Sequence, residues 1–217
     1  MVKKTRMKID KNTIKNYDKI YRTNLINSLS GLKSAFLIGT INENSQTNLS
    51  IVNSVVHIGA NPPLIGFIQR PTSVERHTYE NIINTGYYTI NAVSRKMIEQ
   101  AHQTSARYDR STSEFEAVLL KEEYMSNFLA PFVKESPIKI GVTWKEELDI
   151  KANNTKLIVG NIEFLEISER LINNHGNIDF FSAECAGVIG LDTYFLPQKE
   201  IRLSYAKPTQ PLKREKL

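Results

Sequence analysis

The chain has 217 residues, 41% of them hydrophobic, which is enough to bury a sizeable core and most simply forms one domain over residues 1–217. No apolar run approaches the ~20 residues needed to cross a bilayer, and the basic start "MVKKTRMKID" has no apolar stretch after it. Because Cys185 is the single cysteine, an intrachain disulfide and a thiolate-rich metal site are excluded. We therefore expect a cytoplasmic protein that does not enter a membrane.

The formal net charge of +5 is concentrated at the two ends of the chain. Residues 1–8 contribute +4 and residues 207–217 contribute +3, which leaves −2 for the rest of the sequence. We expect residues 1–9 and 207–217 to be solvated basic tails. This distribution argues against a nucleic-acid partner, which would favour basic residues on a folded surface.

The first half of the sequence mixes predicted helices and strands. Apolar residues spaced three and four apart over residues 12–28 predict an amphipathic helix that ends near Gly31. Strands are predicted at 34–41, 49–59 and 63–69, with a polar turn at 42–48. A helix over residues 74–84, closed by Gly86, precedes a strand at 87–93. Ser94 is then placed to cap a helix over residues 94–105.

The second half is more plainly β. From residue 138 to residue 150, apolar residues hold most even positions, and polar residues or glycine hold the odd ones. This alternation predicts one buried and one solvated face, as in an antiparallel sheet. In "KLIVGNIEFLEI" the alternation shifts near Gly160, which predicts a β-bulge. Since strands outnumber helices, we predict a mainly β fold, a closed or nearly closed antiparallel barrel with peripheral helices.

The common catalytic and nucleotide-binding motifs are missing from this sequence. It contains no GxGxxG, no GxxxxGK[ST], no HExxH and no Cys/His pair at zinc spacing. Its four histidines are scattered, and Cys185 stands in the apolar stretch "AECAGVIG", as structural cysteines usually do. We therefore assign no catalytic residue and no metal site.

One unusual stretch is the predicted strand "LSIVNSVVHIG". It is apolar on both faces, yet it contains Ser50, Asn53 and Ser54. Buried polar side chains need hydrogen-bond partners, which neighbouring backbone or a ligand could supply. The pattern alone leaves both explanations open.

A second unusual stretch follows the strand "PLIGFIQ", where Arg70 is succeeded by "PTSVERHT". Pro71 fixes the backbone as it leaves the sheet. The hydroxyl groups and the start of the next helix could donate to an anion, and Arg70 could offer a planar fork to a phosphate. The alternative is an ordinary solvated loop with a helix cap.

The order of elements in the sequence resembles the flavin reductase-like family of FMN-binding split barrels. The segment that carries the resemblance is "SAFLIGTINENSQTNLSIVNSVVHIGANPPLIGFIQRPTSVERHTYENIINTGYYTINAV". The likeness covers about residues 36–115 and continues weakly through "SPIKIG" and "LIVGNI" to "GLDTYF". The stretches "RPT…RHTYENI" and "AHQTSARYD" are similar to a flavoredoxin-like bacterial subgroup. The resemblance implies a split antiparallel β-barrel.

The resemblance also implies a flavin site. By position, Arg70, Thr72, His77 and Thr78 become candidates for contact with the flavin phosphate. Candidates for the ribityl chain and the ring edge are Ser50, Asn53, Ser54 and Val55, with Asn91 and Ser105 on the opposite wall. The implied cofactor is FMN, with FAD possible, and the implied assembly is a homodimer with the flavin near the subunit interface.

The function that follows is a flavin-dependent oxidoreductase, in which NAD(P)H passes a hydride to the flavin and an unknown acceptor takes the electrons. Such chemistry needs alignment more than a protein acid or base, which agrees with the absence of a catalytic constellation. A flavin-binding electron carrier without NAD(P)H turnover shares the same residue arguments. A nucleic-acid-binding barrel is a further alternative, but the adjacent Tyr87 and Tyr88 point to opposite strand faces and form no stacking platform.

Overall fold

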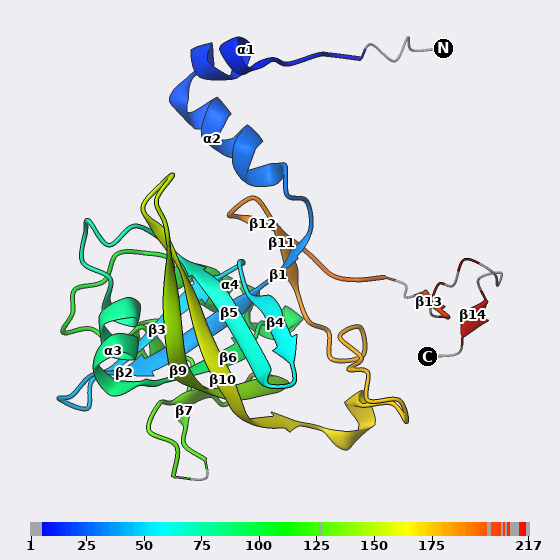
Figure 1. The fold of residues 1–217 in the computed structure, drawn as a ribbon. Coiled ribbons are helices and arrows are strands. Elements are labelled where there is room, and N and C mark those ends of the chain that lie inside the picture. The colour runs from blue at the N-terminus through cyan, green and yellow to red at the C-terminus, as the bar shows by residue number, and fades with distance from the viewer. Residues whose placement is uncertain are drawn as a thin grey trace.

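The structure, a computed structural model, describes residues 6–125, 127–198, 201–204, 206, 208 and 213–215. Its centre is a seven-stranded antiparallel sheet in the order β3-β2-β6-β9-β10-β5-β4, which curls into a barrel (Figure 1). The strands of this sheet are β2 Phe36–Ile41, β3 Thr47–Val52, β4 Val56–Ala60, β5 Pro63–Gln69, β6 Tyr87–Ala92, β9 Ile138–Ile150 and β10 Thr155–Ile167. The predicted mainly β fold with peripheral helices is confirmed.

Short strands and helices surround the barrel. The short strands are β1 Lys33–Ser34 with β11 Gly187–Ile189 and β12 Thr193–Phe195, β7 Glu122–Glu123 with β8 Phe132–Val133, and β13 Arg202–Leu203 with β14 Arg214–Glu215. The helices are α1 Lys11–Asn16, α2 Lys19–Ser28, α3 His77–Thr85, α4 Ile98–Gln103 and α5 Glu114–Ala117, with 3-10 turns η1 Arg95–Met97 and η2 Glu169–Leu171. Among the described residues, none of the helices has the length and apolar character to cross a membrane.

Apolar clusters hold the barrel and the elements packed on it together. Inside the barrel, Phe67, Tyr88 and Ile158 are almost fully buried, and α3 contributes Ile82 to this cluster. A second cluster outside the sheet joins residues of β2 and β3 to η1, α4 and α5, among them Leu49. The predicted helix closure at Gly86 is confirmed, because this residue ends α3 with φ 77°, a left-handed conformation that glycine adopts without strain.

The predicted N-terminal helix is divided in two. The chain breaks at Tyr17, and the Asp18 carboxylate begins α2 by accepting hydrogen bonds from the backbone N–H groups of Ile20 and Tyr21. Neither α1 nor α2 contains a buried residue, and the pair extends away from the barrel (Figure 1). The prediction of one helix was therefore wrong, because the capping carboxylate starts a new helix.

The predicted strand over residues 49–59 is also divided, into β3 and β4, which form the two edges of the sheet. Between them the Ser54 hydroxyl binds the backbone of Ile68, and the Asn53 side-chain amide donates to the carbonyl of Gly190 at 2.8 Å. These bonds take the chain out of the β3 ladder. The polar residues thus mark a corner that a periodic reading of the sequence does not reveal.

Two helix starts differ from the predictions. Helix α3 begins at His77 instead of residue 74, because the chain from 70 to 76 forms a turn in which Arg76 Nε donates to the carbonyl of Pro71. Ser94 precedes a 3-10 turn, and its side chain makes no capping hydrogen bond. Ser94 instead forms an isolated β-bridge with Cys185.

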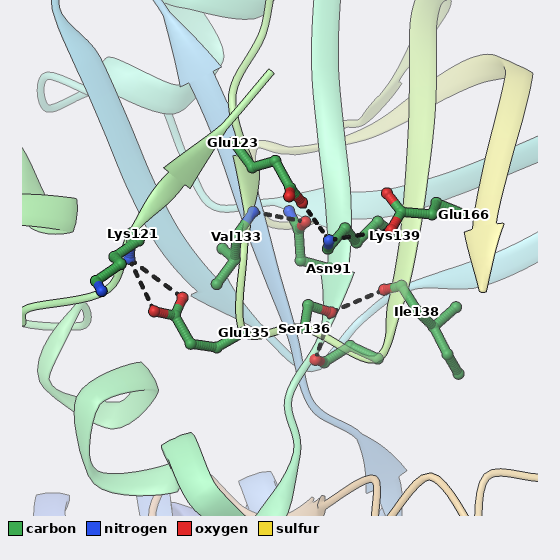
Figure 2. Close-up of polar contacts among 10 residues, drawn as sticks. Asn91, Lys121, Glu123, Val133, Glu135, Ser136, Ile138, Lys139 and Glu166 are labelled. Atoms are coloured by element: carbon green, nitrogen blue, oxygen red, sulfur yellow. Dashed lines mark hydrogen bonds and ion pairs between the residues drawn. The ribbon is translucent and has the colours of Figure 1, made fainter. Parts of the chain in front are cut away.

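Strand β9 has the predicted bounds but no fully solvated face. Figure 2 shows Lys139, at an odd and therefore expected wet position, beneath the β7–β8 segment, where it ion-pairs with Glu123 and Glu166. Only 6% of the Lys139 side chain is exposed. The segment that follows β7 covers this face of the sheet, so the alternation predicted the strand but not what lies over it. The bulge predicted near Gly160 is confirmed by a register shift between Val159 and Gly160.

The expected basic tails lie only in part within the described residues. Residues 1–5, 207, 209–212, 216 and 217 lie outside them. Within the expected C-terminal tail, Arg214 and Glu215 form β14 and pair with β13. This part of residues 207–217 is therefore a strand rather than a free tail.

Candidate functional site

A cleft of about 400 Å³ opens on the barrel where β3 and the end of β5 face α3. Four segments line it besides the strands: the loop at 70–76, the start of α3, the stretch at 104–108 that follows α4, and the start of α5. The lining residues are Asn48, Ser50, Ile51, Val52, Ile68, Gln69, Arg70, Val74, Glu75, Arg76, His77, Thr78, Thr104, Ser105, Ala106, Arg107, Tyr108 and Glu114.

Three arginines meet at this cleft from two different loops. Arg70 and Arg76 come from the loop after β5, and Arg107 comes from the stretch after α4. Burial, together with the positive charges of Arg70 and Arg107, lowers the pKa of Arg76. Among the described residues none of the three forms an ion pair with a carboxylate. Like charges held together without counter-charges favour an anionic ligand.

The N-terminus of α3 adds backbone donors to the same place. The side chain of the N-cap residue, Arg76, makes no capping hydrogen bond, although Glu80 accepts the Arg76 backbone N–H at 3.1 Å, and His77 and Thr78 of the first turn line the cleft. A helix start presents the N–H groups of its first turn and a partial positive charge. The helix is fixed because Asn48 donates to Thr78 Oγ1 at 2.9 Å and Asn81 donates to Thr40 Oγ1 at 3.1 Å. These buried bonds aim the start of α3 at the cleft.

The floor of the cleft is the edge strand β3, whose outward N–H groups are satisfied by side chains. Leu49 N–H donates to the Glu114 carboxylate at 2.9 Å, and Ile51 N–H donates to Thr104 Oγ1 at 3.0 Å. Burial raises the pKa of Glu114, against the Leu49 bond, which lowers it. Glu114 therefore seals a sheet edge, because its carboxylate accepts the outward N–H of Leu49.

Half of the predicted site residues line this cleft. The structure brings together Ser50, Arg70, His77, Thr78 and Ser105. Thr72 is exposed on the loop at 70–76 but does not line the cleft. Asn53, Ser54 and Val55 lie at the corner between β3 and β4, outside the lining. Ligand contact by these nine residues stays a prediction.

Asn91 is placed in the core and not on a cleft wall. It is fully buried, donates to the Leu37 carbonyl and to Thr89, and accepts the N–H of Val133 at 3.0 Å (Figure 2 shows the last bond). Its oxygen and nitrogen therefore join two strands to the segment after β7. The expectation of a cofactor contact for Asn91 does not agree with this placement, because its polar atoms already have protein partners.

The sequence predictions missed Arg107 and Glu114, and they named Asn48 in no role. Arg107 stands in "AHQTSARYD", which lies some 30 residues from Arg70 in the sequence, and only the barrel brings the two arginines to one cleft. The stretch "AHQTSARYD", which already carried the family resemblance, was the signal that could have pointed to Arg107. For Glu114 no sequence signal existed, since its partner is a backbone N–H 65 residues away.

Comparison with known proteins places the fold in a family. The model of the family described as "Flavin reductase like domain" matches residues 32–181, which is more than half of the chain. A crystal structure from Shewanella frigidimarina NCIMB 400, described as a flavin reductase with a split barrel domain, is 48% identical with a TM-score of 0.89. It covers 93% of this chain and 100% of its own.

Two more distant structures share the fold. The flavoredoxin of Desulfovibrio vulgaris (Miyazaki F) is 19% identical with a TM-score of 0.67, over 82% of this chain and 92% of its own. An FMN-binding protein from Thermus thermophilus is 15% identical with a TM-score of 0.68, over 83% of this chain and 93% of its own. The barrel is thus a split barrel, and the chain belongs to the flavin reductase-like domain family of flavin-binding oxidoreductases.

Proposed function

We propose that the protein binds FMN in the cleft beside α3 and acts as an NAD(P)H-dependent flavin reductase. The observation that carries this proposal is the group of three arginines at the start of α3, none of which pairs with a carboxylate within the described part of the chain. A terminal phosphate carries close to two negative charges near pH 7 and accepts several hydrogen bonds, so it matches this set of donors. The Thermus protein named as FMN-binding supports the same cofactor.

The residues present fit the rest of such a cofactor. Arg70, Arg76 and Arg107 would hold the phosphate, with N–H groups of the first turn of α3. Ser50 lines the cleft from β3 and would donate to or accept from the hydroxylated ribityl chain. The apolar side chains of Ile51, Val52 and Ile68 line the same wall and would exclude water from a flat ring.

When bound, the flavin supplies the redox chemistry by accepting a hydride from a nicotinamide. The chain's own residues would bind and orient, since transfer depends on bringing two rings within about 3–3.5 Å. We assign no protein acid or base to this step. NADH and NADPH both remain candidate donors, and the likeness to a flavoredoxin supports an alternative in which the protein carries electrons without nicotinamide turnover.

We also propose that the protein is a homodimer, with the interface beside the cleft. Ile58 of β4 and Leu148 of β9 are 38% and 49% exposed. They lie on one face of the sheet: Leu148 pairs with Leu157, and Leu157 and Ile58 both flank Gly66. Leu157 also pairs with Ile68, which lines the cleft. An apolar face of this kind is typically covered by another chain.

Titration with FMN, FAD and riboflavin, followed by flavin fluorescence, tests the cofactor. We expect FMN to bind with saturation and more tightly than riboflavin, because riboflavin lacks the phosphate. Anaerobic mixing with NADH or NADPH then separates reductase from carrier: rapid bleaching of the bound flavin supports the reductase. Absence of saturable binding by all three flavins would contradict both functions.

Light scattering tests the dimer. We expect a mass of twice 24.7 kDa at micromolar concentration, shifted toward the monomer by Leu148→Glu. Leu165→Glu is the matched control, because Leu165 is similarly exposed, at 42%, but near the far end of β10. A wild-type mass of a single chain would contradict the dimer.

A further inference from the structure

Two carboxylates lie beside the arginine cluster, and one of them, Glu80, accepts the backbone N–H of Arg76 at 3.1 Å. Glu75 lines the cleft and is adjacent in sequence to Arg76, and Glu80 lies in the first turn of α3. Glu75 also approaches His77 Nε2 at 3.5 Å. Carboxylates at this position would repel a phosphate or pair with the arginines that should hold it. We therefore expect the cleft to bind an anion only if another cation pairs with these two carboxylates.

Arg110 forms ion pairs with both Glu75 and Glu80. Its Nε and Nη2 donate to the same Glu75 oxygen at 2.8 and 2.7 Å, and its Nη2 also contacts Glu80 Oε2. The ion pairs lower the pKa of Glu75 and raise that of Arg110, so the carboxylate and the guanidinium both stay charged. Arg110 thus pairs with carboxylates, whereas within the described residues the three cleft arginines form no such ion pair.

Arg110 also comes from the other side of the cleft. It follows Arg107 and Tyr108 in the stretch after α4, whereas Glu75 and Glu80 belong to the loop after β5 and to α3. The exposed fraction of the side chain is 41% for Arg110, 60% for Glu75 and 37% for Glu80. Ion pairs this exposed contribute little to global stability. These ion pairs can still change the local electrostatic potential at the cleft, whatever they contribute to the free energy of unfolding.

We propose that Arg110 is a positioning residue that neutralises Glu75 and Glu80 and so leaves Arg70, Arg76 and Arg107 free to bind a phosphate dianion. This inference rests on the proposed flavin function. It assigns Arg110 a role toward the charged end of the cofactor, with no contact to the flavin ring. The competing explanation is that Arg110 only braces the two loops.

The test is the dissociation constant of FMN and of riboflavin for wild type, Arg110→Gln and the triple variant Arg110→Gln with Glu75→Gln and Glu80→Gln. We expect Arg110→Gln to weaken FMN binding roughly fivefold to tenfold, since two partly screened charges are released near the phosphate. Riboflavin binding should not change, and the triple variant should recover most of the FMN affinity. Arg95→Gln is the matched control, because Arg95 is 64% exposed and its ion pair with Glu184 spans 3.9 Å.

The outcomes separate the two explanations. Equal FMN affinity for wild type and Arg110→Gln would overturn the inference alone, with the flavin function intact. An equal loss for FMN and riboflavin, or no recovery in the triple variant, would show bracing and also overturn it. A wild type that binds neither flavin would overturn the proposed function and this inference together. Melting temperatures of all variants establish that each one is folded.

Discussion

Two charged clusters of this protein differ in whether their cations have carboxylate partners. Lys139 is buried, and Glu123 and Glu166 meet its ammonium group (Figure 2). Arg70, Arg76 and Arg107 gather at a cleft, and among the described residues no carboxylate pairs with them. A buried charge without a partner destabilises the fold, so the ion pairs of a buried cation serve the stability of the protein. Cations left unpaired at a cleft are available to a ligand.

The first cluster holds the β7–β8 segment on the sheet. Lys139 contacts β7 through Glu123, and Asn91 contacts β8 through the Val133 N–H. Thr89 donates to the Pro131 carbonyl at 2.7 Å within the same interface. Gly39 is required there because a side chain at that position would collide with Pro131 and Thr89. Within the described residues, the guanidinium groups of the second cluster have no carboxylate partner, and Arg76 Nε donates to the carbonyl of Pro71.

The largest expected effect comes from breaking the paired cluster. Lys139→Ala should lower the free energy of unfolding by about 3 kcal/mol, because it empties the buried space of the Lys139 side chain and leaves the partly exposed Glu123 and Glu166 without their cation. The affinity of the folded variant for FMN should not change. Urea unfolding and flavin titration of the same preparation measure both quantities, and a large loss of affinity would place Lys139 in the site and erase the contrast.

The next effect concerns Asn91, which the sequence placed at the flavin and the structure places in the core. Asn91→Ala should cost roughly 2 kcal/mol of stability, because the buried N–H of Val133 loses its acceptor. FMN affinity should stay close to that of wild type. The opposite pattern, a stable variant that binds FMN poorly, would restore the cofactor role.

Removing a cation from the unpaired cluster should affect binding and not folding. Arg70→Ala should weaken FMN binding by about 1.5 kcal/mol, or roughly tenfold, which is the size of a charge-assisted hydrogen bond. Arg70→Lys should recover only part of this loss, because an ammonium group keeps the charge but cannot make a two-pronged contact. The melting temperature of the flavin-free protein is the control. Unchanged affinity would shift attention to Arg76 and Arg107.

The smallest expected effect concerns Tyr88, a polar residue that, among the described residues, is unpaired but lies away from the cleft. Tyr88 is fully buried, and its hydroxyl is the buried side-chain atom without a hydrogen-bond partner in the described part of the chain. It faces Gly160 inside the barrel and lines none of the cleft. Tyr88→Phe should raise the stability by about 1 kcal/mol or less, because a desolvated hydroxyl is removed. A loss of stability in thermal unfolding would indicate that the hydroxyl has a bonded water.

The sequence by itself determined the elements whose signals are local. The alternation over β9 gave its bounds, the shift at Gly160 gave the bulge, and Gly86 gave the end of α3. The order of these elements also indicated the family, and Arg70 with the hydroxyls that follow it made the loop after β5 a candidate anion site. Each of these features depends on side chains a few residues apart, so a linear reading detects it.

Only the tertiary structure decided which distant side chains meet. Arg107 joins Arg70, Glu114 seals the edge of β3, and Lys139 is buried beneath a segment that the alternation could not anticipate. The corner at Asn53 and Ser54 likewise depends on bonds to Gly190, which follows β11, and to Ile68 of β5. The physical reason is that pairing of charges and satisfaction of polar groups are set by through-space neighbours, and closure of the barrel supplies these neighbours.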